Sequence, residues 1–199
     1  MDKQSVLGAA QDRVEWLRSK TNYLEFPSSP KAKAASACFG ITLDHHQGII
    51  VLIDAGIFAP ALALVRAAFE AYVRGAWLWQ CATEMDAEDY LAGGSRPNIE
   101  RQLRALENAE PTAKRHLSKL KQAKWAAMSG FTHAGGLHAQ RWLNDVYVEA
   151  NYAPEELKSA VAFSELIGAV AAVGLAEIAG NDLLAQAVHN EWMLWVTNV

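Results

Sequence analysis

The chain has 199 residues, of which 51% are hydrophobic and 20% charged, a composition that excludes an intrinsically disordered protein. Its 18 basic and 22 acidic side chains give a formal net charge of −4. No overall positive field therefore attracts a nucleic-acid backbone, and any anion site must be local. No repeat or linker divides the sequence, so we expect residues 1–199 to form a single helical domain.

The first half of the sequence predicts three long helices. Apolar residues recur at spacings of three and four, and the alternation typical of strands is almost absent. The first helix is expected at residues 3–24, and the second at 32–55 with Gly56 as a left-handed stop. The third, at residues 60–83, is apolar nearly all round, which predicts a central position in the fold. We therefore expect an all-α bundle of about seven to nine helices.

Shorter helices are expected in the middle of the chain, at residues 86–92 and 97–108, the latter capped by Ser95. Another runs from Pro111 to Gly130 and carries a basic cluster that we interpret as a solvated face. The members of the cluster are Lys114, Arg115, Lys119, Lys121 and Lys124.

The last third begins with residues 131–144, expected as a helix or a kinked continuation that breaks near Gly135. A long apolar helix follows at residues 154–180, and the last helix is capped by Asn181 or Asp182. The most apolar run is too short to cross a bilayer, so we expect a core helix and no membrane partner. Two cysteines and a charged N-terminal region favour a reducing, cytoplasmic location.

The apolar third helix carries one ladder of charges, Arg66, Glu70 and Arg74, at spacings that place them on one face. Two guanidinium groups face one carboxylate, so one positive charge is left over. In one interpretation Asp54 balances it in a static network. In the other, the surplus charge faces a pocket and receives an anion. If the ladder is buried, Glu70→Ala should cost about 3 kcal/mol or more.

His133 adds an acid–base group to this set. If the segment is helical, His133 and Arg141 share a stripe, and Thr132 supplies a hydroxyl beside the ring. The alternative is a hydrogen-bonded structural histidine. None of the six histidines shows the spacing of a known metal motif, so we expect no metal and no cofactor.

Two motifs carry a family resemblance: ALALVRAAFEAYVRGAWL at residues 61–78, preceded by DAG at 54–56, and FTHAGG at 131–136. Together they resemble an uncharacterised family of bacterial helical domains, over roughly residues 40–145. The resemblance implies no activity, but it suggests that the charge ladder and His133 belong together.

Such domains are similar in outline to the HEPN superfamily, which includes metal-independent ribonucleases with an Arg four to six residues before a His. No histidine here follows an Arg at that spacing. A substitute would be His133 with Arg141, or an inter-helix pair of His133 with Arg66 or Arg74.

The first functional hypothesis is thus a cytoplasmic binding domain with a partly buried pocket for a small anion or an acidic partner group. Its candidate residues are Asp54, Arg66, Glu70, Arg74, Thr132, His133 and Arg141. The second is a HEPN-like ribonuclease acting on RNA, with His133 and Glu70 as catalytic groups, and the third is a purely structural ion network. No DNA partner is indicated. A homo-oligomer is expected. The long apolar helices at residues 60–83 and 157–180, with small residues such as Gly168 and Gly174, would supply the seam between copies.

Overall fold

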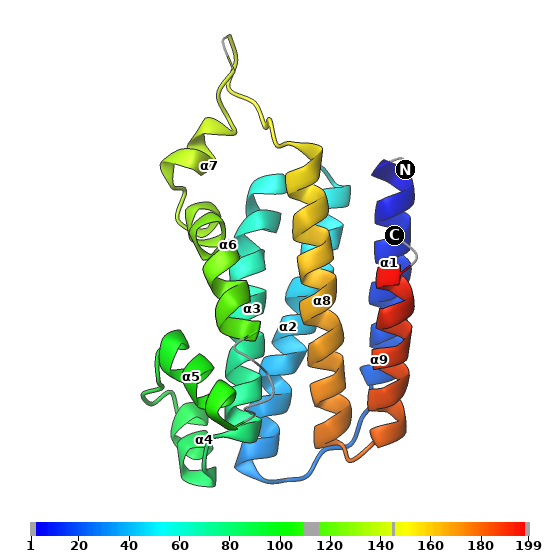
Figure 1. Ribbon diagram of the computed structural model, residues 1–199, viewed down its shortest axis with the longest axis vertical. Helices are drawn as coiled ribbons and strands as arrows, with labels where there is room; N and C mark the ends of the chain where they lie inside the picture. Colours follow the sequence, from blue (N-terminus) through cyan, green and yellow to red (C-terminus); the bar gives the residue numbers. More distant parts are fainter. Residues whose placement is uncertain (1–2, 110–115, 145, 198–199) are drawn as a thin grey trace.

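The computed structural model describes residues 3–109, 116–144 and 146–197, and in these ranges every regular element is a helix (Figure 1). The all-α prediction is confirmed. The helices are α1 (Lys3–Thr21), α2 (Pro30–Asp54), α3 (Phe58–Gln80), α4 (Glu84–Leu91), α5 (Ile99–Ala109), α6 (His116–Thr132), α7 (Gly136–Gln140), α8 (Pro154–Ile178) and α9 (Asp182–Thr197).

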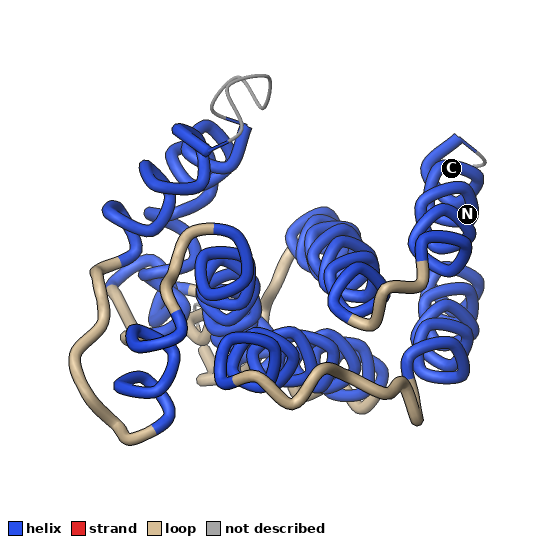
Figure 2. The backbone as a smooth tube through the Cα atoms, turned by 90° about the horizontal axis from the view of Figure 1, so that it is seen from below, coloured by secondary structure: helices blue, strands red, loops and turns tan. Residues whose placement is uncertain are grey.

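Three long helices, α2, α3 and α8, form the centre of the bundle and contact one another (Figure 2). Helices α1 and α9 lie side by side along one flank, and α4, α5 and α6 cover the other. By length and composition α8 could cross a membrane, but 67% of its most apolar window is buried inside the bundle. That burial is typical of a core helix.

Local signals set several helix ends. Ser29 accepts a hydrogen bond from the Ala32 backbone N–H and starts α2 earlier than expected. Gly56 has a φ of +76° and ends the turn after α2, as predicted. Asn98, rather than Ser95, caps α5, because its side-chain oxygen accepts from the backbone N–H of Arg101 at 3.0 Å.

Of the two alternatives for residues 131–144, the interrupted one is confirmed, with the break before Gly136. Helix α6 ends at Thr132, the short α7 follows Gly135, and the chain then leaves the bundle as an exposed excursion. Pro111, expected to open α6, lies outside the described residues, as do Lys114 and Arg115 of the basic cluster.

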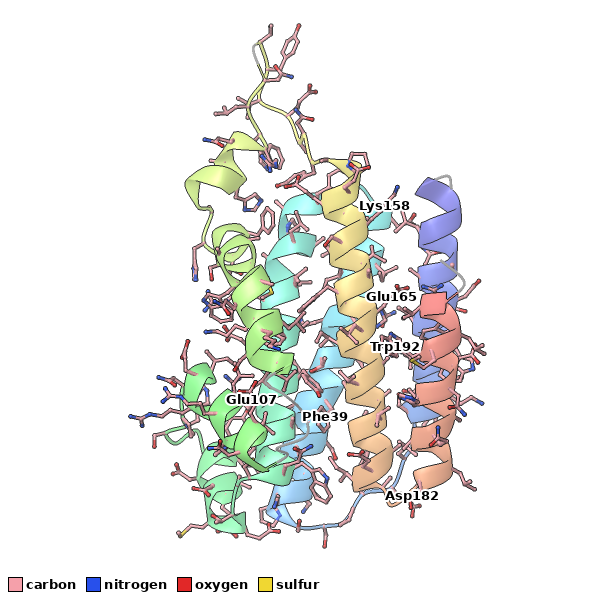
Figure 3. All side chains as sticks on the ribbon, viewed as in Figure 1. Phe39, Glu107, Lys158, Glu165, Asp182 and Trp192 are labelled. Carbon is pink, nitrogen blue, oxygen red and sulfur yellow. The ribbon has the colours of Figure 1, made fainter. Side chains whose placement is uncertain are left out.

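Helix α2 approaches its neighbours closely because glycines face two of its buried side chains, Phe39 and His46. The Phe39 ring lies between α3 and α8 (Figure 3), where a Cβ at Gly174 would be 2.6 Å from its Cε2. A Cβ at Gly168 would be 2.5 Å from the Nδ1 of His46. Both glycines thus face α2, and the expected seam between copies at these positions is wrong. Burial also lowers the pKa of His46 to about 4, so the ring is neutral in the core.

We expect Gly174→Ala to destabilise the protein by about 1–3 kcal/mol, because the added methyl group overlaps the Phe39 ring. Gly40→Ala in α2 is the matched control: nothing lies within 4 Å of its Cβ, so it should stabilise by about 0.5–1 kcal/mol. Urea denaturation measures both changes. Equal effects of the two substitutions would show that this packing is not tight.

Candidate functional site

Arg66 projects from α3 toward α6 and is held there by four side chains. Its Nε donates to Oε1 of Glu70 at 2.7 Å. Its Nη1 contacts Oγ of Ser129 at 3.2 Å and Nε2 of His133 at 3.0 Å. Its guanidinium carbon lies 4.4 Å from the centre of the Trp125 ring, in a cation–π contact. We call these five residues the Arg66 site.

The contact with Arg66 determines which nitrogen of His133 carries the proton. An arginine only donates hydrogen bonds, so Nε2 of His133 accepts and the proton of the neutral ring sits on Nδ1. The His133 ring is otherwise exposed. A proton added at Nε2 would break the bond to Arg66, so the ring's charge and its position are linked.

The Arg66–Glu70 ion pair is only partly buried. The side chains are 22% and 30% exposed, so solvent screens the pair and loss of Glu70 does not leave a fully desolvated cation. The loss of stability expected for Glu70→Ala is therefore smaller than the value given above for a buried ladder.

Arg74 belongs to a different environment, two turns further along α3. Its guanidinium lies near Tyr90 of α4, whose hydroxyl lies 3.4 Å from Sγ of Cys38 on α2. Its Nε is buried and has no partner among the described residues. Arg74 forms no ion pair with any residue that the structure describes, and it lies at the α2–α4 side of α3, outside the Arg66 site. Even so, burial raises the pKa of the Cys38 thiol, because desolvation outweighs the nearby positive charge.

Asp54 does not balance the charge ladder, contrary to our first interpretation. It is exposed at the end of α2, and its Oδ2 accepts from Nε2 of Gln11 on α1 at 3.2 Å. Thr132 is the last residue of α6, and its hydroxyl donates to the Met128 carbonyl at 2.8 Å. Neither residue contributes a group to the Arg66 site, although Thr132 lies beside His133 in the chain.

Arg141 is also separate from His133. The helix break after α6 turns it toward α8, where Nε and Nη2 bind the carboxylate of Glu156 at 2.9 and 2.7 Å. These bonds lower the pKa of Glu156 below its usual value. The shared stripe predicted for His133 and Arg141 is therefore wrong.

Sequence reasoning missed Trp125 and Ser129. A signal was present, because Trp125, Ser129 and His133 stand at i, i+4 and i+8; the first two share one face of α6, and His133 extends it through its backbone bond to Ser129. A second network was also missed: Trp142 donates to the Tyr152 hydroxyl at 3.0 Å, and that hydroxyl lies 2.6 Å from Nε2 of His138.

The Arg66 site borders a groove between α5 and α6. Trp125 lines both, and Nζ of Lys121 lies 4.3 Å from its ring centre while binding Glu100 at 2.6 Å. The groove has a volume of about 480 Å³, and its lining includes Arg104, Ser118 and Gln122. No cluster of metal-ligating side chains occurs in the part of the chain that the structure describes.

A model for a family of unknown function, DUF6988, matches residues 39–192 of the chain. The chain belongs to the DUF6988 family. The matched range covers the Arg66 site and the α5–α6 groove, so this DUF6988 protein carries both within its family region. No curated protein and no solved structure matches the chain.

We expect Glu70→Ala to destabilise the DUF6988 protein by about 1 kcal/mol, because a partly exposed pair is lost while Trp125, Ser129 and His133 still hold Arg66. Glu88→Ala, at an exposed position in α4, is the control and should stay within about 0.5 kcal/mol. Urea denaturation of both variants makes the comparison. A loss of about 3 kcal/mol at Glu70 would mean that the pair is effectively buried.

Proposed function

We propose that this DUF6988 protein is a helical binding domain that takes a phosphate or carboxylate group at the Arg66 site. The proposal rests on the Arg66 guanidinium, which keeps one donor nitrogen without an acceptor among the described residues. Its Nε and Nη1 are used by Glu70, Ser129 and His133, whereas no described residue accepts a hydrogen bond from Nη2. An oriented, partly exposed donor of this kind suits the planar geometry of an anionic group.

The surroundings support an anion rather than a cation. Trp125 and Glu70 fix the plane of the guanidinium, so an anion meets a donor that is already oriented. A proton added at Nε2 of His133 would break its bond to Arg66, and the Nη1 donor of Arg66 would then be free for the anion. Arg104 lines the adjoining α5–α6 groove together with the Lys121–Glu100 ion pair, and the remainder of a small ligand, or an acidic segment of a partner, would lie there.

Binding of inorganic phosphate tests the proposal. In a two-dimensional NMR titration, we expect phosphate to shift the Arg66 Nε–H and His133 ring signals saturably. Arg66→Gln should weaken binding at least tenfold, because a charge-assisted hydrogen bond contributes about 1.5–3 kcal/mol. Lys33→Gln, which removes an exposed cation on α2, should leave binding unchanged. No saturable shift in the wild type, or equal binding by the Arg66 variant, would leave a purely structural ion network.

A metal-independent ribonuclease of HEPN type is the second candidate, and one distance favours it. Arg66 Nη1 and His133 Nε2 lie 3.0 Å apart across α3 and α6. Such a pair has the parts that RNA cleavage needs: a guanidinium to bind the phosphate and an imidazole to move a proton. In this reading Glu70 orients Arg66, and RNA takes the place of the small anion.

Incubation with single-stranded RNA in EDTA tests the second candidate. Cleavage by the wild type should be lost in His133→Ala and retained in His189→Ala, which changes an exposed histidine on α9. Intact RNA after incubation with the wild type would remove the ribonuclease and leave the binding domain.

A further inference from the structure

A second cavity lies at the end of the bundle where α8 begins, away from the Arg66 site. It has a volume of about 310 Å³ and is formed by four helices and the segment before α8. Its apolar wall consists of Leu7 of α1, Ile53 of α2, Phe58 of α3, Leu157 and Val161 of α8, and Tyr152. None of these residues belongs to the charge ladder or to the α5–α6 groove, so the cavity is independent of the proposed anion site.

The wall of this cavity offers hydrocarbon and aromatic surface. Ile53 and Val161 are buried in the core. Tyr152 packs edge-on against Phe58, with ring centres 5.6 Å apart. Its hydroxyl is already bonded to His138 and Trp142, so the ring rather than the polar group is available to a ligand. Pockets that bind small molecules have this apolar, preformed character.

Few polar side chains line the cavity, and the charged one among its lining residues is a lysine. Lys158 and the amide residue Asn151 line it and are exposed to solvent, and no carboxylate side chain lines it. Lys158 forms no ion pair with any residue that the structure describes. Figure 3 shows it on α8, on the side that faces α1. The two carboxylates in the first turn of α8, Glu155 and Glu156, line a different cavity.

We infer that this cavity binds a small apolar monocarboxylate, with the hydrocarbon part inside and the carboxylate at Lys158. Charge complementarity selects an acid, since an amine would meet the ammonium group of Lys158. The size of the cavity sets the length of the ligand. A cavity of about 150 Å³ holds benzene, so one of about 310 Å³ accommodates about twice as many carbon atoms.

Calorimetric titration with octanoate, 1-octanol and octylamine tests the inference. We expect the wild type to bind octanoate at least tenfold more tightly than octanol, and octylamine not measurably. Lys158→Met should abolish the preference for octanoate over octanol, whereas Lys33→Met, which removes an exposed lysine of α2, should preserve it. Val161→Phe should fill the cavity and weaken both ligands at least tenfold.

Two further results complete the test. Arg66→Gln should bind octanoate like the wild type, which separates this cavity from the proposed anion site. A thermal melt of Val161→Phe checks that the variant is folded, and Lys158→Met, at an exposed position, does not depend on core packing. Equal binding of octanoate and octanol by the wild type, an unchanged preference in Lys158→Met, or no saturable binding of octanoate would each overturn the inference.

Discussion

The close packing of α2 against α3 and α8 is the constraint on which the rest of the structure depends. The Phe39 ring fits only because Gly75 and Gly174 leave room for it, and His46 fits because Gly168 does. Interiors packed at this density transmit any added volume to the backbone. The position of α3, and with it the direction in which Arg66 projects toward α6, follows from this contact. The glycines that face α2 and the neutral His46 ring thus help to position the charged Arg66 site on the other side of α3.

In the Arg66 site, different parts of one guanidinium group make different contacts. Its face lies on Trp125, its Nε is bonded to Glu70, and its Nη1 meets Ser129 and His133. A long side chain usually loses conformational freedom when it binds a ligand, at a cost of about 0.5–1.5 kcal/mol. Here the contacts within the protein already hold the Arg66 side chain in one conformation before a ligand binds. The site is also partly screened by water, so its contribution to stability is small while its donors stay accessible.

Much of the fold could be predicted from local sequence patterns. The site could be predicted only in part, because it depends on contacts between helices that are distant in the sequence. The spacing of apolar residues identified the long helices, and Gly56 marked a real left-handed turn. The spacing of Arg66 and Glu70 likewise predicted their ion pair. Arg74 shares their stripe but lies two turns away, where α2 and α4 replace α6 as neighbours. Arg141 follows a helix break, after which the period of 3.6 residues no longer relates it to His133.

A chain of hydrogen bonds holds the base of the segment between α6 and α8 to the end of α6. The Phe131 carbonyl accepts from Nδ1 of His138, so Nε2 of that ring accepts from the Tyr152 hydroxyl, which in turn accepts from Trp142. Beyond this chain, residues 146–148 are exposed, and the bonds of the Val146 and Tyr147 backbone N–H groups are local ones, to Oδ1 of Asn144. Hydrogen-exchange protection in this region should therefore change abruptly at Trp142. The outer turn opens as a local unit, while the bundle on the inner side of the fastening opens only with the whole fold.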